Sequence, residues 1–183
     1  MNQNALDDAL DEARRGQEWG VVVLFRAFNP GLVRFLRHHV RGFEEDVASE
    51  VWVSAARLLP RFRGDARAFR ALLFTLARRR TVDHYRRKAR QPSLVEFGEV
   101  NEPVDGADLE TAVVADLSAQ EAIEALVKGL PTTQAEVVLL RVVGELSVDE
   151  VAEMLGRSPG SVRVIQHRAL QRLARKSKEV VTR

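Results

Sequence analysis

The stretch from Leu146 to Lys176, LSVDEVAEMLGRSPGSVRVIQHRALQRLARK, contains start and stop signals for two helices one tight turn apart. Ser147 and Glu150 match an S-x-x-E capping box, which predicts a first helix that begins at Val148. Gly156 can supply the left-handed backbone conformation that commonly ends such a helix. The stretch is therefore typical of two helices that cross at a short turn.

The second helix of this pair is expected to begin at Pro159, because proline at the first helical position loses no hydrogen bond. Apolar residues recur at helical spacing on one of its faces: Val162, Ile165, Ala169 and Leu173. Arginine and polar residues point the other way, as in a recognition helix: Arg163, Val164, His167 and Arg168. The pattern predicts a DNA-binding helix-turn-helix, with an ordinary helical hairpin that has a solvated basic face as the alternative.

Charge is distributed unevenly along the chain. The net charge is only +2, but residues 57–90 carry twelve basic residues against two acidic ones. Residues 157–183 carry eight basic residues against one acidic residue, whereas residues 91–127 contain no lysine or arginine. Two separate cationic surfaces suggest that the protein contacts a long polyanion twice.

Several classes of function are disfavoured by what the sequence lacks. The chain has no cysteine, which excludes an internal disulfide or a thiolate zinc site. His38 and His39 are interpreted as solvated residues near a helix end, because they have no partner at ligand spacing. No Gly-rich phosphate loop or catalytic triad pattern is present, so we expect no enzyme and no cofactor. The apolar runs are too short to span a membrane, and no signal peptide is evident, which predicts a cytoplasmic protein without membrane insertion.

The N-terminal part predicts three helical segments. Asn4 is expected to cap the first helix, and Gly16 is expected to end it. The next helix is expected over residues 19–28. Its apolar stripe consists of Val21, Leu24, Phe25 and Phe28. The triplet Asn29-Pro30-Gly31 predicts a kink or a break, after which residues 32–40 continue the helical spacing.

Two further helices carry contrasting charge. Three acids at Glu44, Glu45 and Asp46 suit a helix N-terminus, and an apolar face follows at Val47, Val51, Ala55 and Leu58. Pro60 is expected to end this helix, and residues 62–65 read as a loop. The helix that starts at Ala68 is apolar in its first half and rich in arginine in its second half. A basic helix with interspersed aromatic rings suits a single nucleic-acid strand, and a solvated basic helix is the alternative.

Residues 91–117 contain proline, glycine and seven acids but no basic residue, so they are interpreted as a flexible acidic linker. A helix capped from Ser118 to Glu121 and ending at Gly129 is expected to follow. Thr133 with Glu136 then predicts a second capping box, for a helix that continues to Gly144. Both helices are expected to pack under the helix-turn-helix.

Three segments, in this order, resemble an extracytoplasmic-function (ECF) sigma factor of the bacterial sigma-70 family. They are EEDVASEVWVSAARLLPRFRG, AFRALLFTLARRRTVDHYRRKAR and LPTTQAEVVLLRVVGELSVDEVAEMLGRSPGSVRVIQHRALQRL. The resemblance covers nearly the whole chain from Val21 onward. It implies an all-α fold of two small helical domains, with sigma region 2 at residues 1–90 and sigma region 4 at residues 118–183, joined by the linker.

The resemblance also implies a function, namely an RNA polymerase sigma factor that directs promoter-specific initiation. The implied partners are core RNA polymerase, through its β′ clamp coiled coil and β flap, promoter DNA and an anti-sigma factor. The implied polymerase-binding residues are Asp46, Ser49, Glu50 and Trp52. Those implied for the minus-ten element and strand opening are Phe62, Arg63, Arg67, Arg78, Arg79, Arg80, His84, Arg86 and Arg87. Those implied for the minus-thirty-five element are Ser161, Arg163, Val164, His167, Arg168 and Arg172.

Three positions depart from the family pattern. Ser49 replaces a usual glutamine in the docking helix, Leu72 replaces a common tryptophan, and Arg79 replaces a frequent asparagine. These changes bear on which minus-ten base is bound. Two other functions fit parts of the sequence: a free-standing helix-turn-helix regulator that binds duplex DNA as a dimer, and a regulatory protein that sequesters a partner.

Overall fold

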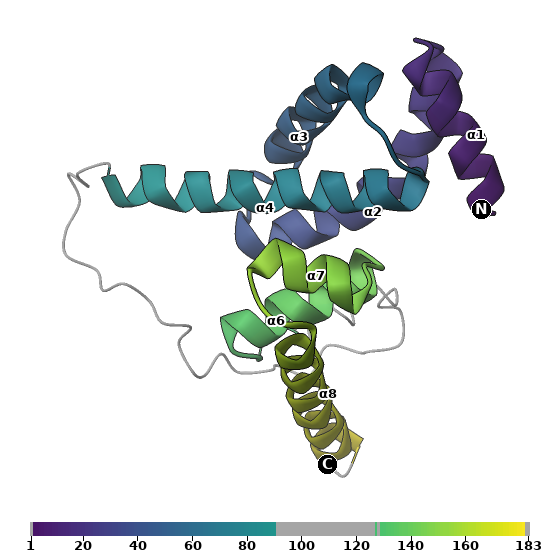
Figure 1. Ribbon diagram of the computed structural model, residues 1–183. Coiled ribbons are helices and arrows are strands. Elements are labelled where there is room, and N and C mark those ends of the chain that lie inside the picture. Colours follow the sequence, from purple (N-terminus) through teal and green to yellow (C-terminus); the bar gives the residue numbers. More distant parts are fainter. Residues whose placement is uncertain (1, 91–126, 128, 182–183) are drawn as a thin grey trace.

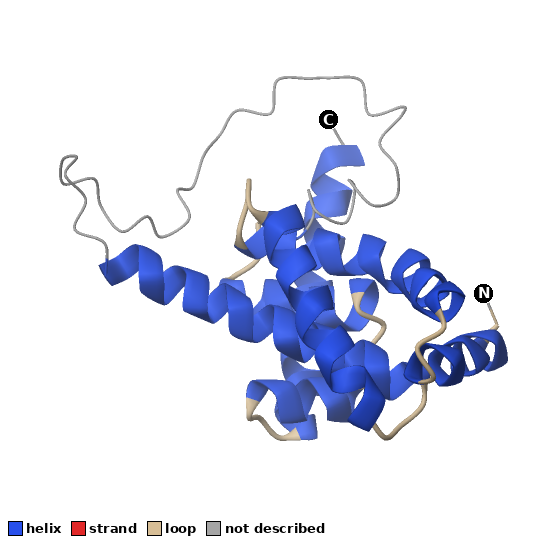
Figure 2. Cartoon of the chain, turned by 90° about the horizontal axis from the view of Figure 1, so that it is seen from above, coloured by secondary structure: helices blue, strands red, loops and turns tan. Residues whose placement is uncertain are grey.

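The computed structural model describes residues 2–90, 127 and 129–181, without the side chains of residues 87–90 and 176–181. Every regular element in these ranges is helical, which confirms the all-α prediction (Figures 1 and 2). The predicted linker and most of the helix expected from Ser118 to Gly129 lie outside the described residues.

The N-terminal half is built around one long central helix. Its elements are α1 (Gln3–Arg14), α2 (Glu18–His39), α3 (Glu44–Leu58), the short 3₁₀ helix η1 (Leu59–Arg61) and α4 (Ala66–Arg90). Helices α1, α3 and α4 each pack against α2 (Figure 1). Buried aromatic and aliphatic side chains fill the space between them, including Leu24, Phe35, Phe69 and Phe74. This packing fixes α3 and α4 side by side.

Helix α2 is continuous through residues 29–31, so of the predicted kink or break, the break does not occur. Pro30 lies inside the helix, where it cannot donate a hydrogen bond to the carbonyl of Arg26. Both residues are exposed, so water can reach this part of the helix. Only part of the apolar stripe predicted for this helix faces the core. Leu24 and Phe28 are buried, whereas 44% of Phe25 is exposed.

Individual capping groups, both local and distant in sequence, account for the other boundaries in the N-terminal half. Asn2, and not Asn4, caps α1, since its side chain accepts a hydrogen bond from the amide of Asn4. Gly16 follows the helix with a φ of +82°, as its predicted role requires. Helix α4 begins at Ala66, two residues before the predicted start, because the carboxylate of Asp7 accepts a hydrogen bond at 2.7 Å from the Ala66 amide.

The end of α2 differs from the prediction of solvated histidines. The His39 side chain is half-buried and its ring packs against Phe35, with ring centroids 4.6 Å apart. Burial lowers the pKa of His39 to about 4, with smaller contributions from His38 and Arg78. His39 is therefore neutral at neutral pH and belongs to the packed end of the helix.

The same helix is long and apolar enough, by composition, to cross a membrane. The side chains that make it apolar include Leu32, Phe35 and Leu36, which are fully buried in the core. These side chains face the core of the bundle, which accounts for part of the apolar composition of the helix.

The C-terminal half consists of α6 (Thr132–Val138), the π-helical segment η2 (Leu139–Val143), α7 (Val148–Leu155) and α8 (Pro159–Val181). Helix α7 has the predicted capping box, with both reciprocal hydrogen bonds between Ser147 and Glu150. Gly156 ends it with φ of +61° in the left-handed region. Helices α6 and α7 both pack against α8, which gives the helix-turn-helix arrangement (Figure 1).

The second predicted capping box, at Thr133 and Glu136, is wrong. Helix α6 begins two residues earlier, at Thr132, with Pro131 at the cap position and no side-chain hydrogen bond to the helix start. The Glu136 carboxylate instead accepts a hydrogen bond at 2.9 Å from Nε of Arg78, which belongs to α4. A tertiary ion pair has replaced the local cap.

We expect Ser147→Ala to lower the free energy of unfolding by about 1 kcal/mol, the usual contribution of an N-terminal capping side chain. Thr133→Ala is the matched control, because Thr133 occupies the same motif position without forming the cap. Its effect should remain within about 0.5 kcal/mol. Urea unfolding followed by circular dichroism measures both. Equal effects for the two variants would contradict the assigned caps.

Candidate nucleic-acid interface

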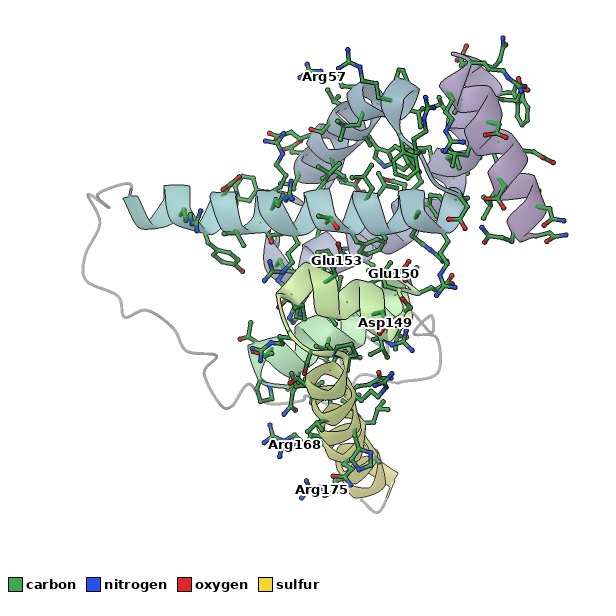
Figure 3. The ribbon with its side chains drawn as sticks, in the orientation of Figure 1. Arg57, Asp149, Glu150, Glu153, Arg168 and Arg175 are labelled. Atoms are coloured by element: carbon green, nitrogen blue, oxygen red, sulfur yellow. The ribbon has the colours of Figure 1, made fainter. Side chains whose placement is uncertain are left out.

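The outward face of α8 carries all the residues predicted to read duplex DNA. Val162 and Ala169 are fully buried on the opposite face, where α8 packs against α6 and α7. The predicted residues are all exposed: Ser161, Arg163, Val164, His167, Arg168 and Arg172. In Figure 3 the Arg168 side chain extends away from the body of the protein. The structure thus brings this predicted set together on one accessible face, as insertion into a DNA groove requires.

Hydrogen bonds within α8 distinguish the members of this set. The Ser158 hydroxyl caps the helix by accepting a bond at 3.2 Å from the Ser161 amide, and it lies 3.0 Å from the Ser161 hydroxyl. His167 Nε2 lies 2.9 Å from the Gln171 side-chain nitrogen. In the described part of the chain, no carboxylate forms an ion pair with Arg163. Arg163 is therefore better placed to contact DNA than Ser161 or His167.

The first turns of α4 and the loop before it are held firmly in place. The Phe62 ring packs against Phe69, with centroids 5.5 Å apart, and the Arg14 guanidinium lies 5.6 Å from the Phe62 centroid. Arg14 also donates a hydrogen bond to the Gly64 carbonyl. Phe62 is half-buried as a result, whereas the neighbouring Arg63 is exposed. The loop therefore presents Arg63 to solvent between two residues that contact the rest of the domain.

The predicted minus-ten arginines on α4 differ in their partners. Arg67 Nε lies 3.7 Å from a carboxylate oxygen of Glu150, and Arg78 Nε lies 2.9 Å from one of Glu136. Arg79 is exposed, and no ion pair joins it to an acid among the described residues. Of these three arginines, Arg79 is the one whose charge is most available to a phosphate.

Near the end of α4, two ring-bearing side chains contact other elements. The His84 ring lies 5.3 Å from that of Phe43, and the Tyr85 hydroxyl donates a hydrogen bond to the His39 carbonyl. Burial raises the pKa of Tyr85, so the hydroxyl keeps its proton. Arg86 is exposed, and the side chain of Arg87 lies outside the described residues. The contacts orient this half of the helix beside the end of α2.

The predicted docking residues lie on the exposed side of α3. Asp46, Ser49 and Glu50 are all exposed, although the Ser49 hydroxyl donates a hydrogen bond at 2.9 Å to the carbonyl of Glu45. Glu50 forms an ion pair at 3.4 Å with Arg80 of α4. The predicted docking surface and the predicted strand-opening helix are therefore directly connected.

Trp52, the fourth predicted docking residue, faces α2 more than solvent. Its indole N–H donates a hydrogen bond at 2.9 Å to the Asn29 side chain, and its ring packs on Phe25 with centroids 5.1 Å apart. It lines an apolar groove of about 240 Å³ between α2 and α3, together with Val21 and Val53.

The sequence placed Val21 and Phe25 in an apolar stripe but did not predict this groove. The sequence signal that could have revealed the groove is Val53. It lies three and four residues after Glu50 and Ser49, on the same face of α3, and 51% of it is exposed. An exposed apolar residue among polar ones indicates that the docking surface includes an apolar part.

No cluster of three or more histidine or acidic residues suited to a metal ion occurs among the described residues.

Comparison with known proteins identifies the two halves. The family model for sigma-70 region 2 matches residues 24–91, and the model for sigma-70 region 4 matches residues 120–173. The ECF RNA polymerase sigma factor ShbA of Streptomyces griseus is 40% identical over 136 residues, which cover 73% of this chain and 71% of ShbA. The ECF RNA polymerase sigma factor SigD of Mycobacterium tuberculosis is 33% identical over 180 residues, which cover 94% of this chain and 84% of SigD.

Two solved structures have a similar fold at 21% identity, each with a TM-score of 0.62. One is CnrH in complex with the cytosolic domain of CnrY, and the match covers 96% of this chain and 98% of CnrH. The other is the sigma factor RpoE in complex with the anti-sigma factor NepR from Bartonella quintana. This match covers 84% of this chain and 94% of RpoE. With both regions matched and relatives this similar over most of their length, the chain belongs to the ECF sigma factors of the sigma-70 family, which bind core RNA polymerase and direct promoter-specific transcription initiation.

Proposed function

We propose that this sigma factor divides promoter recognition among three helices. Helix α3 docks on the clamp coiled coil of the polymerase β′ subunit through Asp46, Ser49, Glu50 and the apolar groove beside Trp52. Helix α4 and the loop before it bind the minus-ten element and hold the opened strand. Helix α8 reads the minus-thirty-five element, with the surrounding C-terminal helices contacting the β flap.

The observation that carries this proposal is the pair of exposed cationic surfaces on separate helices. Arg63 and Arg79 are exposed on or beside α4, and Arg163 and Arg168 are exposed on α8. Each surface lies within a segment matched by the corresponding sigma-70 region. Arginine binds phosphate and guanine well, because its planar guanidinium donates paired hydrogen bonds.

A gel-shift experiment with and without core polymerase tests this function. We expect tight, sequence-specific binding of a promoter fragment only when core polymerase is present. A free-standing dimeric regulator would bind its palindromic site equally well without polymerase. Specific binding by the chain alone, unaffected by added core enzyme, would therefore contradict the proposal.

Other features of the proposal follow from the family. Sigma factors of this family are non-enzymatic, soluble initiation factors, and we propose that this one acts in the cytoplasm without a cofactor. Its domains are taken as residues 1–90 and 118–183, joined by the linker at 91–117. An anti-sigma factor is expected to control it, since both similar solved structures are complexes, one of them with a named anti-sigma factor.

Arg79→Ala is expected to weaken open-complex formation by about tenfold to a hundredfold, because a hydrogen bond to a charged group contributes about 1.5 to 3 kcal/mol. Closed-complex binding should change much less, since Arg79 is proposed to hold the displaced strand. Permanganate reactivity of unpaired thymines measures strand opening, and a gel shift at low temperature measures closed-complex binding. Arg57→Ala is the control, because Arg57 is exposed at the far end of α3 (Figure 3). Normal melting in the Arg79 variant would rule out this role.

A further inference from the structure

A cavity of about 480 Å³ lies where α2 and α4 meet the end of η2. Cavities that bind small molecules in proteins span about 300 to 1,000 Å³, so its size suits a small organic molecule. None of its lining residues belongs to the sets proposed to bind polymerase or promoter DNA. The proposed function therefore leaves this cavity unexplained.

Three arginines line the cavity from two helices of the N-terminal half. Arg26 and Arg34 belong to α2, and Arg70 belongs to α4. Among the described residues, Glu145 is the only acidic one that lines it. Three guanidinium groups against one carboxylate leave a formal excess of two positive charges around the cavity, which favours an anionic ligand.

The two arginines of α2 are available to such a ligand. Neither Arg26 nor Arg34 forms an ion pair with a described carboxylate. Arg26 is exposed, and Arg34 is half-buried. A guanidinium without a carboxylate partner can offer its paired donors to phosphate oxygens.

Arg70 is held in place, and it already binds an oxyanion. Its guanidinium lies 5.8 Å from the centroid of the Phe28 ring and pairs with the carboxylate of Glu145. Only 17% of the Arg70 side chain is exposed, whereas 69% of the Glu145 side chain is. Glu145 also has a φ of +50°, a conformation that residues other than glycine seldom adopt. An exposed residue in an unfavourable conformation thus supplies an anion that a phosphate can replace.

Apolar side chains complete the walls of the cavity. Pro30 lies between the two arginines of α2 in sequence, and Val142 of η2 contributes a side chain that is 47% exposed. An apolar wall with a few charged groups is typical of sites for organic ligands, whereas an inorganic anion would use the arginines alone. Arg26 and Arg34 are eight residues apart, about 12 Å along the helix axis. Two linked phosphates match this separation better than one.

We propose that this cavity binds a nucleoside diphosphate. The phosphates lie among Arg26, Arg34 and Arg70, and the base and sugar lie against Pro30 and Val142. The site shares no residue with the proposed polymerase and DNA surfaces, so it goes beyond the proposed function and stands or fails independently of it.

The first test is calorimetric titration of the full chain with ADP and with GDP, without divalent cations. We expect one saturable site, and Arg34→Ala should weaken binding at least about tenfold, because it removes hydrogen bonds between charged groups. Arg41→Ala is the control, since Arg41 is an exposed arginine just beyond α2 that does not line the cavity. Thermal unfolding monitors the fold of both variants. No saturable binding of either nucleotide up to about 1 mM, or equal loss in the two variants, would overturn the proposal.

Glu145→Gln should have the opposite effect and strengthen nucleotide binding severalfold, because it removes a negative charge beside the phosphates and releases Arg70. A gain in affinity cannot result from a folding defect. Asp149→Asn is the control, since it removes the same charge from an exposed position of the same half that does not line the cavity. Unchanged or weaker binding in Glu145→Gln would contradict the placement of the phosphates beside Arg70.

Two further probes identify the kind of phosphate. Inorganic pyrophosphate should bind severalfold more weakly than ADP, because it makes no use of the apolar wall. Equal binding would mean a simple anion site, and the nucleotide assignment would be wrong. A single-stranded minus-ten oligonucleotide, added to the complex with core polymerase, should bind equally well to the wild type and to Arg34→Ala. If Arg34→Ala weakened oligonucleotide binding as much as it weakened ADP binding, the phosphate at this cavity would be that of DNA and the proposal would fail.

Discussion

Reversal of charge at both Asp46 and Glu50, to lysine, is expected to abolish transcription directed by this sigma factor. Both carboxylates are exposed on the outer side of α3 and make no contact with the core of the domain. A polymerase surface that is complementary to these two carboxylates would meet lysines of its own charge sign in the variant. Such juxtaposition of like charges costs several kcal/mol at a protein interface. A loss of about 3 kcal/mol would weaken binding to core polymerase more than a hundredfold.

The comparison of single variants separates docking from strand opening. Glu50→Lys also breaks the ion pair with Arg80, whereas Asp46 forms no ion pair among the described residues. Asp46→Lys should therefore lower polymerase affinity without a separate effect on minus-ten binding. Glu45→Lys is the matched control, since it places the same charge in the same first turn of α3 and has the same unfavourable effect on the helix dipole.

Polymerase affinity is measured with the labelled sigma factor and core enzyme, and the fold is monitored by thermal unfolding. We expect the melting temperature of the double variant to match that of Glu45→Lys. If helicity were lost in the double variant but not in the control, the two carboxylates would have a structural role and the docking assignment would be wrong.

Arg163→Ala is expected to flatten the preference of the holoenzyme among minus-thirty-five sequences. Arginine pairs bidentately with guanine, and one such pair contributes roughly 1 to 3 kcal/mol of base discrimination. Preference for the best base over the others should thus fall by about fivefold to a hundredfold at one position. Arg168→Ala is expected to have the same kind of effect at a neighbouring position.

Arg175 provides the matched control on the same helix. Its side chain is exposed near the end of α8 and extends outward (Figure 3), where it should meet phosphate. Arg175→Ala should weaken all sequences alike and reduce the salt dependence by about 0.9 of an ion. The measurement is binding of a randomised minus-thirty-five library at several salt concentrations. Unchanged base preference in both Arg163→Ala and Arg168→Ala would mean that α8 does not read sequence as proposed.

Local signals in the sequence predicted the helix-turn-helix correctly. Ser147 and Glu150 formed the predicted capping box, and Gly156 adopted the predicted left-handed conformation. These features depend on groups only three or four residues apart, so the chain needs no distant contact to form them. The buried face of α8 followed from the same short-range spacing.

Local sequence signals were misleading about helix boundaries where tertiary contacts compete with them. Thr133 and Glu136 have the spacing of a capping box, but Glu136 pairs with Arg78, which is 58 positions away in sequence. Pro30 was expected to kink or break its helix, and the break does not occur, since α2 continues through it within the packed bundle. In both cases packing against a distant segment decided the outcome against local preference.

The sequence by itself determined that the chain is helical, where its two cationic surfaces lie along the chain, and which face of α8 is apolar. These properties follow from residue type and from the 3.6-residue period of a helix. Only the tertiary structure decided which charges remain available. Arg67 and Arg79 have the same chemistry and are both exposed, but of the two only Arg67 has a carboxylate, that of Glu150, within ion-pair distance among the described residues. Charge pairing over such separations depends on how the two halves pack, which no local pattern encodes.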